Sequence, residues 1–533
     1  MAFTRSTFLL PLLGISAGAM AQAPQLAWAS FFDGNLPGLD IANALVVAPD
    51  NTVYVTGESA NMAPQGTITT IRYNTTGAQL WADHPYGPSQ DSFNQGSDIA
   101  LDAMGHVYVA GTIANNGGDF ALIKYNANGR IWKKNFEQYP GADVPDECLG
   151  LDVDAQGNAY MAGLITSTSG MGLEPYVIMT DSAGNAQWGD NLSLSSIDER
   201  LTGVGVSPGG NIYVAGDWWN TATQTGVDVS VARYSTSGSR LWKEGQAMPL
   251  SQDHATRIAT TADDHALVCG TAKGLTDMDF VAFERDEDGG LVWEGVYDGM
   301  ASGNDEAVDI EQLASGPIAV TGHTREELDG QLRHAITTML IEGGQVLWTR
   351  HFLGDGELGA WPTRMTTDAQ GNIYVAGYST TTGATTTDGA IVKYDLNGDL
   401  QWSIAYDAGS DQNDRFNDIA LNSAGDVLVC GAAYTGSTAS RYVTAQFGNA
   451  VGMNDPVVGN LAPIVFPNPA SSIVHVGSQG YPGPIEVFNA LGTRVLATSA
   501  LRGIDVSAWN KGVYLIRTGS GNKTTTSRFT VQH

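Results

Sequence analysis

The sequence predicts an all-β protein: an eight-bladed β-propeller closed by its N-terminal strand, followed by a small antiparallel β-sandwich domain. Three observations support this prediction. A segment of about 53 residues recurs eight times, each copy contains four strand-like segments, and the repeat stops about 80 residues before the end. The expected domains are a signal peptide (1–21), the propeller (22–448), a linker (449–462) and a C-terminal domain (463–533).

The first residues have the pattern of an export signal. Arg5 supplies the positive charge, Phe8–Ile15 forms a short apolar run, and Ala19–Ala21 provides the small residues of a cleavage site. We therefore expect cleavage between Ala21 and Gln22. The apolar run is too short to span a bilayer, which needs about 20 residues, and no later segment approaches that length. The mature protein is expected to have no transmembrane segment.

The composition restricts the classes of partner. The formal net charge is −30, although the last domain, from Pro463 to His533, has six Lys/Arg against two Asp/Glu. A negative surface repels nucleic acid phosphates and anionic lipids, so we expect no nucleic acid partner. The three cysteines are too few, and odd in number, for a disulfide framework.

The repeat is clearest around one glycine-bounded segment. GNIYVAG occurs at Gly371–Gly377 and at Gly210–Gly216, and the other copies are close variants. The glycines that close the eight copies are spaced 52 to 55 residues apart: Gly57, Gly111, Gly163, Gly216, Gly270, Gly322, Gly377 and Gly431. Repeats of this length indicate an array of identical supersecondary units.

Each copy contains four short strand patterns. In the second copy these are Ser97–Asp102, His106–Gly111, Phe120–Tyr125 and Arg130–Phe136. The second pattern is apolar almost without alternation, as expected for a strand covered on both faces, and Asn-Gly or Asp-Gly pairs indicate tight turns. Four strands per unit and eight units fit the radial repetition of a β-propeller.

The chain ends indicate a closed ring. Seven copies carry a tryptophan in the fourth strand, whereas the eighth copy ends after its third strand, Arg441–Phe447. The missing strand is found at the N-terminus, because Leu26–Phe32 aligns with Leu291–Tyr297 and places Trp28 on Trp293. The N-terminal strand should complete the last blade and remove an exposed sheet edge.

These glycine-bounded units resemble the SBBP-type β-propeller repeats of secreted bacterial proteins. The resemblance covers residues 25–448 and implies the fold, but it names no ligand.

The C-terminal segments resemble another family. Phe466–Val476 begins with Pro-Asn-Pro, Ile485–Leu496 contains an Asn-Ala-Leu-Gly turn, and Gly503–Thr518 contains Lys-Gly-Val-Tyr. This order is similar to the type A C-terminal sorting domain of the type IX secretion system of Bacteroidetes. The resemblance implies recognition of residues 463–533 by the secretion machinery, passage across the outer membrane, and a secreted or surface-attached product.

No catalytic motif is found in the expected mature chain. The one match to the serine-hydrolase pattern G-x-S-x-G, at Gly14–Gly18, lies in the signal peptide. Zinc-protease, phosphate-loop and cysteine-pair zinc patterns are absent, so no catalytic residue or cofactor is predicted. The Asp-rich turns Asp152–Gly157 and Asp395–Asp399 suggest calcium, but they also suit ordinary hairpin turns.

A series of acidic residues precedes the first strands of the repeats. Its members are Asp91, Asp146, Asp198, Asp253, Asp305 and Asp414. One carboxylate per blade at one level would form an acidic ring able to attract cations or a basic ligand. The alternative is that these residues cap turns.

Candidate ligand-binding residues are tryptophans in the variable loops. The short turns should gather on one face of the ring, and the dissimilar loops on the other, where binding usually resides. Trp218 and Trp219 belong to such a loop in the fourth blade, and Trp361 enters the seventh. Exposed indoles would stack on sugars or on a partner protein; the alternative is that they pack beneath the loops.

Three functions are consistent with the sequence. The first is a non-enzymatic binding module, secreted or at the cell surface, for a glycan or protein ligand. The second is a glycan-active hydrolase or lyase that uses carboxylates at the ring mouth. The third is a structural component of the surface or matrix.

Overall fold

The computed structural model contains only β structure within the residues that it describes, which confirms the all-β prediction. It describes residues 23–448 except 35, 37, 61–65, 87–93, 114–117, 138–145, 167–171, 193–198, 220–226, 247–249, 275–276, 300–302, 329, 410–411 and 437–438. Beyond these it describes 464–466, 473–477, 485–489, 493–498, 504–520 and 523–532. The expected signal peptide, its predicted cleavage site between Ala21 and Gln22, and the expected linker lie outside the described residues.

Seven sheets in the described part of residues 23–448 consist of four consecutive antiparallel strands. Sheets 1 to 4 comprise β2 (Ile41–Val47), β3 (Val53–Ser59), β4 (Thr67–Tyr73) and β5 (Gln79–Asp83); β6 (Gln95–Leu101), β7 (Val107–Ile113), β8 (Asp119–Asn126) and β9 (Gly129–Phe136); β10 (Glu147–Val153), β11 (Ala159–Thr166), β12 (Leu173–Thr180) and β13 (Ala186–Asn191); and β14 (Arg200–Val206), β15 (Ile212–Trp219), β16 (Val227–Tyr234) and β17 (Arg240–Gln246).

Sheets 5 to 7 repeat this order. They comprise β18 (Leu250–Thr260), β19 (Ala266–Lys273), β20 (Met278–Arg285) and β21 (Leu291–Tyr297); β22 (Glu306–Gln312), β23 (Ile318–Leu328), β24 (Gln331–Glu342) and β25 (Gln345–Phe352); and β26 (Ala360–Thr367), β27 (Ile373–Thr380), β28 (Thr387–Tyr394) and β29 (Leu400–Tyr406). A further sheet, called sheet 8, joins β30 (Asp414–Leu421), β31 (Val427–Tyr434) and β32 (Ser440–Gly448) to β1 (Gln25–Phe32).

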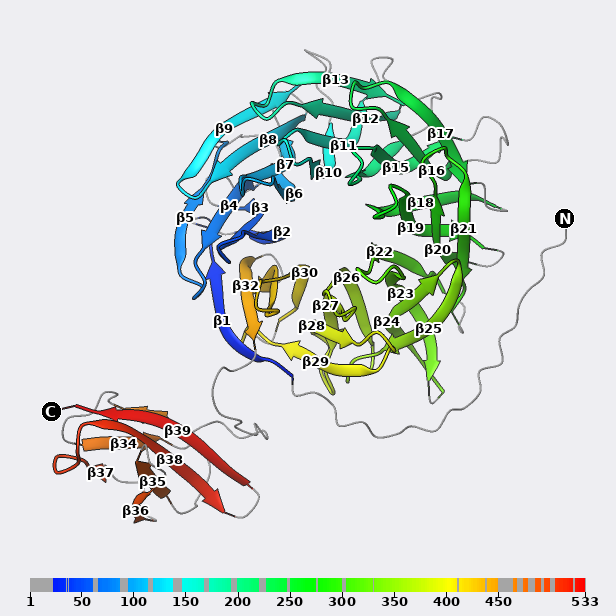
Figure 1. Ribbon diagram of the computed structural model, residues 1–533. Coiled ribbons are helices and arrows are strands. Elements are labelled where there is room, and N and C mark those ends of the chain that lie inside the picture. The colour runs from blue at the N-terminus through cyan, green and yellow to red at the C-terminus, as the bar shows by residue number, and fades with distance from the viewer. Residues whose placement is uncertain are drawn as a thin grey trace. The chain divides into compact units, whose positions relative to one another are not determined.

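The sheets surround a central opening, and the first strand of each sheet lies nearest to it (Figure 1). Apolar side chains fill the space between neighbouring sheets. One core cluster contains Tyr54 and Ile68 of sheet 1 together with Val107 and Ile123 of sheet 2. Since the middle strands are covered on both faces, their side chains are apolar without alternation, as in Val107–Ile113. These four-stranded sheets have the arrangement of propeller blades.

A bulge in the innermost strand explains why every copy of the repeat closes on glycine. In sheet 4 the pairing register shifts between Leu201 and Gly203. A Cβ atom on Gly216 would lie 2.0 Å from the carbonyl oxygen of Arg200. The other closing glycines face the same obstacle at 1.9 to 2.4 Å. Only glycine therefore fits opposite this bulge.

The tryptophan of the fourth strand connects each sheet to the next. Trp188 of sheet 3 donates its Nε1 hydrogen to the carbonyl oxygen of Thr236 in sheet 4, at 3.1 Å. Its ring also covers Gly238 in that turn, where φ is +84°. Trp242 and Trp348 make the same hydrogen bond to the following sheet. The repeated indole is thus a structural contact between sheets.

The C-terminal part is a separate compact unit, residues 450–533. Its described strands are β33 (Ile464–Phe466), β34 (Ile473–Gly477), β35 (Ile485–Asn489), β36 (Arg494–Thr498), β37 (Ile504–Asp505), β38 (Gly512–Ser520) and β39 (Lys523–Val531). They form two sheets, in the orders β33–β34–β37 and β36–β35–β38–β39. The core between them includes Val487, Val506, Tyr514 and Ile516. No helix among the described residues is able to cross a membrane.

Candidate binding site at the mouth of the channel

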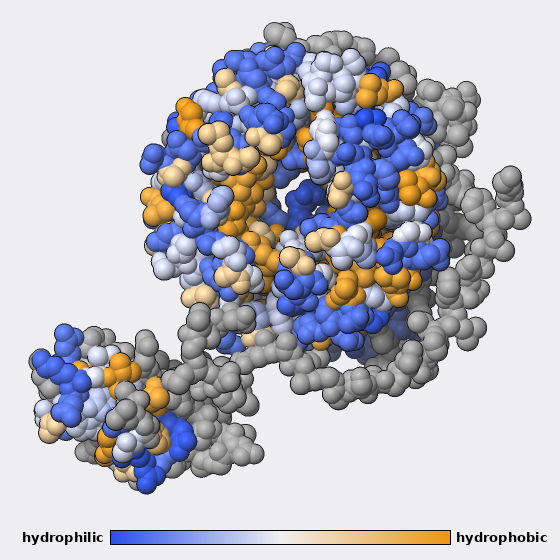
Figure 2. All heavy atoms as spheres, viewed as in Figure 1, coloured by the Kyte–Doolittle hydropathy of each residue, from blue (hydrophilic) through white to orange (hydrophobic). Residues whose placement is uncertain are grey.

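The inner strands begin at one end of the central opening, which Figure 2 shows as a hollow through the ring. The residue sixteen positions before each closing glycine lies at this end and pairs with the residue that follows the glycine. We call these eight pairs the mouth. They are Ile41–Glu58, Gln95–Thr112, Glu147–Leu164, Arg200–Asp217, His254–Thr271, Glu306–His323, Trp361–Tyr378 and Arg415–Ala432.

The mouth differs chemically from one sheet to the next, whereas the strands below it repeat. Apolar residues and glycine fill the middle of β3, β7 and β27, because they pack against neighbouring sheets. The mouth instead presents carboxylates, arginines, imidazoles and an indole. Variation confined to one level of a rigid repeat is typical of a binding surface.

Charged side chains dominate the mouth at sheets 4 to 6. Arg200 Nε donates to Asp217 Oδ2 at 3.0 Å, and His254 Nδ1 lies 2.9 Å from the same oxygen. The hydrogen bond to Asp217 raises the pKa of His254 above its ordinary value. Burial raises the pKa of Glu306, although His254 and Arg200 oppose this shift. Arg200 and His254 thus already have an acidic partner.

Aromatic rings gather at sheets 6 and 7. Trp361 stacks on Tyr378 with ring centroids 5.3 Å apart, and His334 of β24 lies 4.7 Å from the indole. His323 and His334 are also stacked and share a hydrogen bond between Nε2 and Nδ1. Burial lowers the pKa of His323 to about 4, with a further lowering from His334. Burial and the charge of Arg325 also lower the pKa of His334, so both imidazoles are mainly neutral at pH 7.

Arg415 and Glu58 complete the mouth at sheets 8 and 1. Glu58 is 7% exposed, and burial raises its pKa to about 7 while the positive charge of Arg415 opposes the shift. Burial raises the pKa of Tyr378, and the positive charge of Arg415 opposes this shift. One arginine thus lies within electrostatic reach of groups on both sides of it.

A second ring of charges lies below the mouth. Arg257 Nε is 3.5 Å from Asp309 Oδ1, and Arg364 Nε is 3.3 Å from Asp418 Oδ1, in each case on the following sheet. Asp418 also accepts the backbone N–H of Leu45 in sheet 1 at 2.8 Å. These carboxylates join neighbouring inner strands, so their role is structural.

The three tryptophans selected from the sequence have different positions. Trp218 is 2% exposed within the core, and the Lys243 ammonium lies 4.5 Å from its ring centroid, so its faces are not free for a ligand. Trp219 pairs with Val227 along the backbone, and its side chain lies outside the described residues. Trp361 is half-buried at the mouth.

The four described members of the acidic series are buried rather than displayed on the surface. Asp146, Asp253, Asp305 and Asp414 are at most 5% exposed. Asp305 accepts the backbone N–H groups of Gly299 and Arg325, which fixes the loops before and after it. Burial raises its pKa to about 6. These residues cap turns because a buried backbone N–H needs an acceptor.

The strand register places a residue other than aspartate just before the mouth in two sheets. The residue just before the mouth is Asn94 in sheet 2 and Glu199 in sheet 4. Asp91 and Asp198, which the sequence analysis selected, lie outside the described residues.

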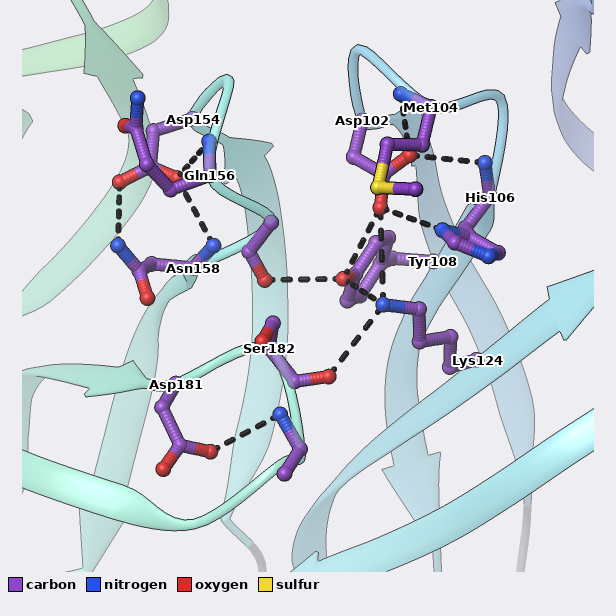
Figure 3. Close-up of polar contacts among 12 residues, drawn as sticks. Asp102, Met104, His106, Tyr108, Lys124, Asp154, Gln156, Asn158, Asp181 and Ser182 are labelled. Atoms are coloured by element: carbon purple, nitrogen blue, oxygen red, sulfur yellow. Dashed lines mark hydrogen bonds and ion pairs between the residues drawn. The ribbon is translucent and has the colours of Figure 1, made fainter.

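The Asp-rich turns use their carboxylates to hold the turn. Asp154 Oδ1 accepts the N–H groups of Gln156 and Asn158, and Oδ2 accepts the side chains of Asn158 and Tyr160. Asp395 likewise accepts the N–H groups of Asn397 and Asp399. Figure 3 shows Asp154 and Asp102 in this role, with their oxygens directed at the turn.

A buried network connects sheets 2 and 3 beside these turns (Figure 3). Lys124 Nζ donates to the hydroxyl of Tyr108 and to the carbonyl oxygen of Ser182, and lies 3.5 Å from Asp102 Oδ2. The Tyr108 hydroxyl donates to the carbonyl oxygen of Gly157 at 2.9 Å. Five polar groups thereby interact between two sheets.

Two groups of carboxylates and a cavity are further candidates for ligand sites among the described residues. Asp277, Asp279 and Asp298 form one carboxylate group, and Asp388, Asp407 and Asp414 another, each with oxygens within 4.8 Å of one another. A cavity of about 800 Å³ is lined by the turns that join the first and second strands in sheets 3 to 6. Its lining includes Asp154, whose oxygens are already hydrogen-bonded.

Family comparisons identify the C-terminal unit. Residues 464–532 match the family described as a secretion system C-terminal sorting domain. The chain carries a type IX sorting domain. It is accordingly an exported protein, secreted or held at the cell surface, and the sorting domain implies recognition by the type IX machinery. Residues 371–400 match a β-propeller domain of unknown function, DUF5122. No curated protein matches the sequence.

Solved structures resemble the chain at low identity. PorZ, a surface component of the type IX secretion system of Porphyromonas gingivalis, is 13% identical with a TM-score of 0.40; the match covers 91% of this chain and 64% of PorZ. A protein of unknown function from Bacteroides caccae is 14% identical with a TM-score of 0.33, covering 56% and 93%. The polysaccharide lyase Uly1 is 12% identical with a TM-score of 0.39, covering 81% and 99%. Such distant likenesses do not indicate a ligand.

Proposed function

We propose that this exported chain is an eight-bladed propeller, closed by β1, that binds a glycan or protein ligand at its mouth without catalysing a reaction. On this account sheets 1 to 8 are the blades, and the first 21 residues are a signal peptide. The observation that carries the proposal is the mouth itself. The eight residue pairs of the mouth differ in charge and polarity, whereas the strands below them repeat the same contacts.

The aromatic group favours a ligand with both apolar and polar faces. Trp361 is half-buried and stands beside Tyr378 and two neutral imidazoles. Aromatic side chains combine large contact area with a polar edge, which is why they are frequent in binding sites. A structural matrix component would have no use for chemically distinct groups at one level.

A glycan and polysaccharide array with the purified chain, run with and without calcium, tests this proposal. Saturable binding is expected, and Trp361→Ala should weaken it at least tenfold. Leu347→Ala is the matched control, because Leu347 is 51% exposed on the outer strand β25, away from the mouth. An array without binding in both conditions argues against a glycan ligand. Shortening of a bound polysaccharide would instead favour a hydrolase or lyase.

A further inference from the structure

We propose that Arg415, Glu58 and Tyr378 form a subsite for a sugar that carries a carboxylate, such as a uronic acid, with Trp361 as its aromatic wall. This inference deepens the proposed function and rests on it. The four residues come from β30, β3, β27 and β26, so the subsite lies where sheets 7, 8 and 1 meet at the mouth.

Arg415 differs from the other arginines of the inner strands. Arg200, Arg257 and Arg364 each have a carboxylate oxygen within 3.0, 3.5 and 3.3 Å, respectively. The side chain of Arg415 makes no hydrogen bond or ion pair with any described residue, and its Nε is buried without a partner. A buried donor without a partner is costly, and a carboxylate is the group that a guanidinium holds best.

Glu58 is the second polar group of the subsite. It is 7% exposed, and the positive charge of Arg415 acts on its carboxyl. Because its pKa is raised to about 7, the carboxyl is partly protonated at neutral pH and can donate to a hydroxyl oxygen as well as accept. A sugar hydroxyl suits both roles.

The aromatic wall favours a pyranose ring over a bare anion. Trp361 and Tyr378 lie nearly parallel, at 15°, and the Arg415 charge acts on Tyr378. Indole and phenol rings pack well against the C–H groups of a sugar while their edges remain polar. A free phosphate or sulfate ion would make no use of this wall.

Electrostatics limits how acidic the ligand can be. The whole chain carries −30, so a densely charged polymer is repelled at long range. A single carboxylate on a largely hydroxylated sugar keeps the pairing with Arg415 and reduces that repulsion. The chemistry therefore indicates a uronic acid residue within a glycan of low charge density.

The test measures binding of the full chain to tetrasaccharides of galacturonate, glucuronate and mannuronate, each beside a counterpart whose carboxyl groups have been reduced to alcohols. We expect at least one uronate to bind at least tenfold more tightly than its reduced form. Arg415→Gln should remove this preference. Arg415→Lys keeps the positive charge but loses the planar guanidinium, so it should keep only part of the preference for the uronate. This variant provides the test if Arg415→Gln fails to fold.

Arg240→Gln is the matched control, because it removes an arginine that has Asp190 as a partner at 3.6 Å and lies in the outer strand β17, outside the mouth. It should leave the uronate preference within about twofold of the wild type. Equal binding of the acidic and reduced sugars would overturn the uronate inference while the binding module remains. Equal losses in the Arg240 and Arg415 variants would also overturn it, since general electrostatics would then explain the preference. No binding to any glycan would overturn the uronate inference and the glycan form of the proposed function, and would leave a protein as the ligand of the module.

Discussion

The indole of Trp28 covers Gly77, and a Cβ atom on this glycine would lie 2.5 Å from the ring. Trp28 is in β1 near the N-terminus, and Gly77 is in the turn between β4 and β5 of sheet 1. The same contact joins consecutive sheets elsewhere, in the pairs Trp132–Gly184, Trp188–Gly238, Trp242–Gly289, Trp293–Gly344 and Trp348–Gly398. β1 therefore makes between sheets 8 and 1 the same tryptophan–glycine contact that the fourth strands in these pairs make with the following sheet.

Gly77→Ala should destabilise the protein through this contact. The residue has φ of +79°, so alanine costs about 1–2 kcal/mol from the backbone alone. Overlap with the indole should add about 1–3 kcal/mol. Chemical unfolding measures the change. Gly425→Ala is the control, because Gly425 has φ of +80° and nothing within 4 Å of the added Cβ. Equal losses in the two variants would show that Trp28 does not press on Gly77.

Gly216→Ala should destabilise the chain for a different reason. Its φ is not in the left-handed region, but the new Cβ would lie 2.0 Å from the Arg200 carbonyl oxygen. Moving this backbone atom away would cost free energy. We expect a loss of about 3 kcal/mol in thermal or chemical unfolding. Gly295→Ala in the outer strand β21 should stay within about 1 kcal/mol of the wild type, since its nearest neighbour is 4.0 Å away. A tolerated Gly216→Ala would mean that the bulge is not rigid.

The fold could largely be predicted because its signals are local and repeated. Asn-Gly turns, apolar second strands and a constant spacing fix the all-β class and the four-stranded units. Cys269 and Cys430, which replace small residues in the repeat, are fully buried. The tryptophan of the fourth strand was also visible as a repeat position, although its hydrogen bond to the next sheet was not.

The site was harder to predict because the repeat conceals it. Trp361 was selected, but Glu58, His323, His334 and Arg415 were not, since each copy places a different residue type at the mouth. The usable signal is the position sixteen residues before each closing glycine, together with the residue after that glycine. Trp218 was selected as a loop residue, yet β15 extends far enough to bury it.

Glu58→Gln should change how stability depends on pH. Burial raises the pKa of Glu58 in the folded chain from 4.5 to about 7, so the folded state holds its proton more tightly than the unfolded state. The wild type therefore loses stability as pH rises from about 4.5 to 7. Glutamine removes this loss and should stabilise the protein at pH 8 by up to about 3 kcal/mol, but hardly at pH 4. Unfolding curves at both pH values measure the difference; a destabilised variant at pH 8 would contradict the assignment.

Tyr108→Phe should weaken the contact between sheets 2 and 3. The hydroxyl accepts from Lys124 and donates to the carbonyl of Gly157, so its loss should cost about 1–3 kcal/mol. A double-mutant cycle with Lys124→Met should show a coupling energy of about 1 kcal/mol, because the two side chains share one network. Additive effects in the cycle would show that the ammonium and the hydroxyl act independently.

The closure of the ring by β1 is the claim on which the proposed site depends. Glu58 belongs to sheet 1 and Arg415 to sheet 8, so an open ring would separate the two residues. Hydrogen–deuterium exchange of the intact chain measures it. If the ring is closed, we expect the amides of β1, which pairs with β32 from Gln25 to Phe32, to be as protected as those of the outer strand β9. Exchange of residues 25–32 at the rate of an unstructured chain, with β9 still protected, would contradict closure and the site that depends on it.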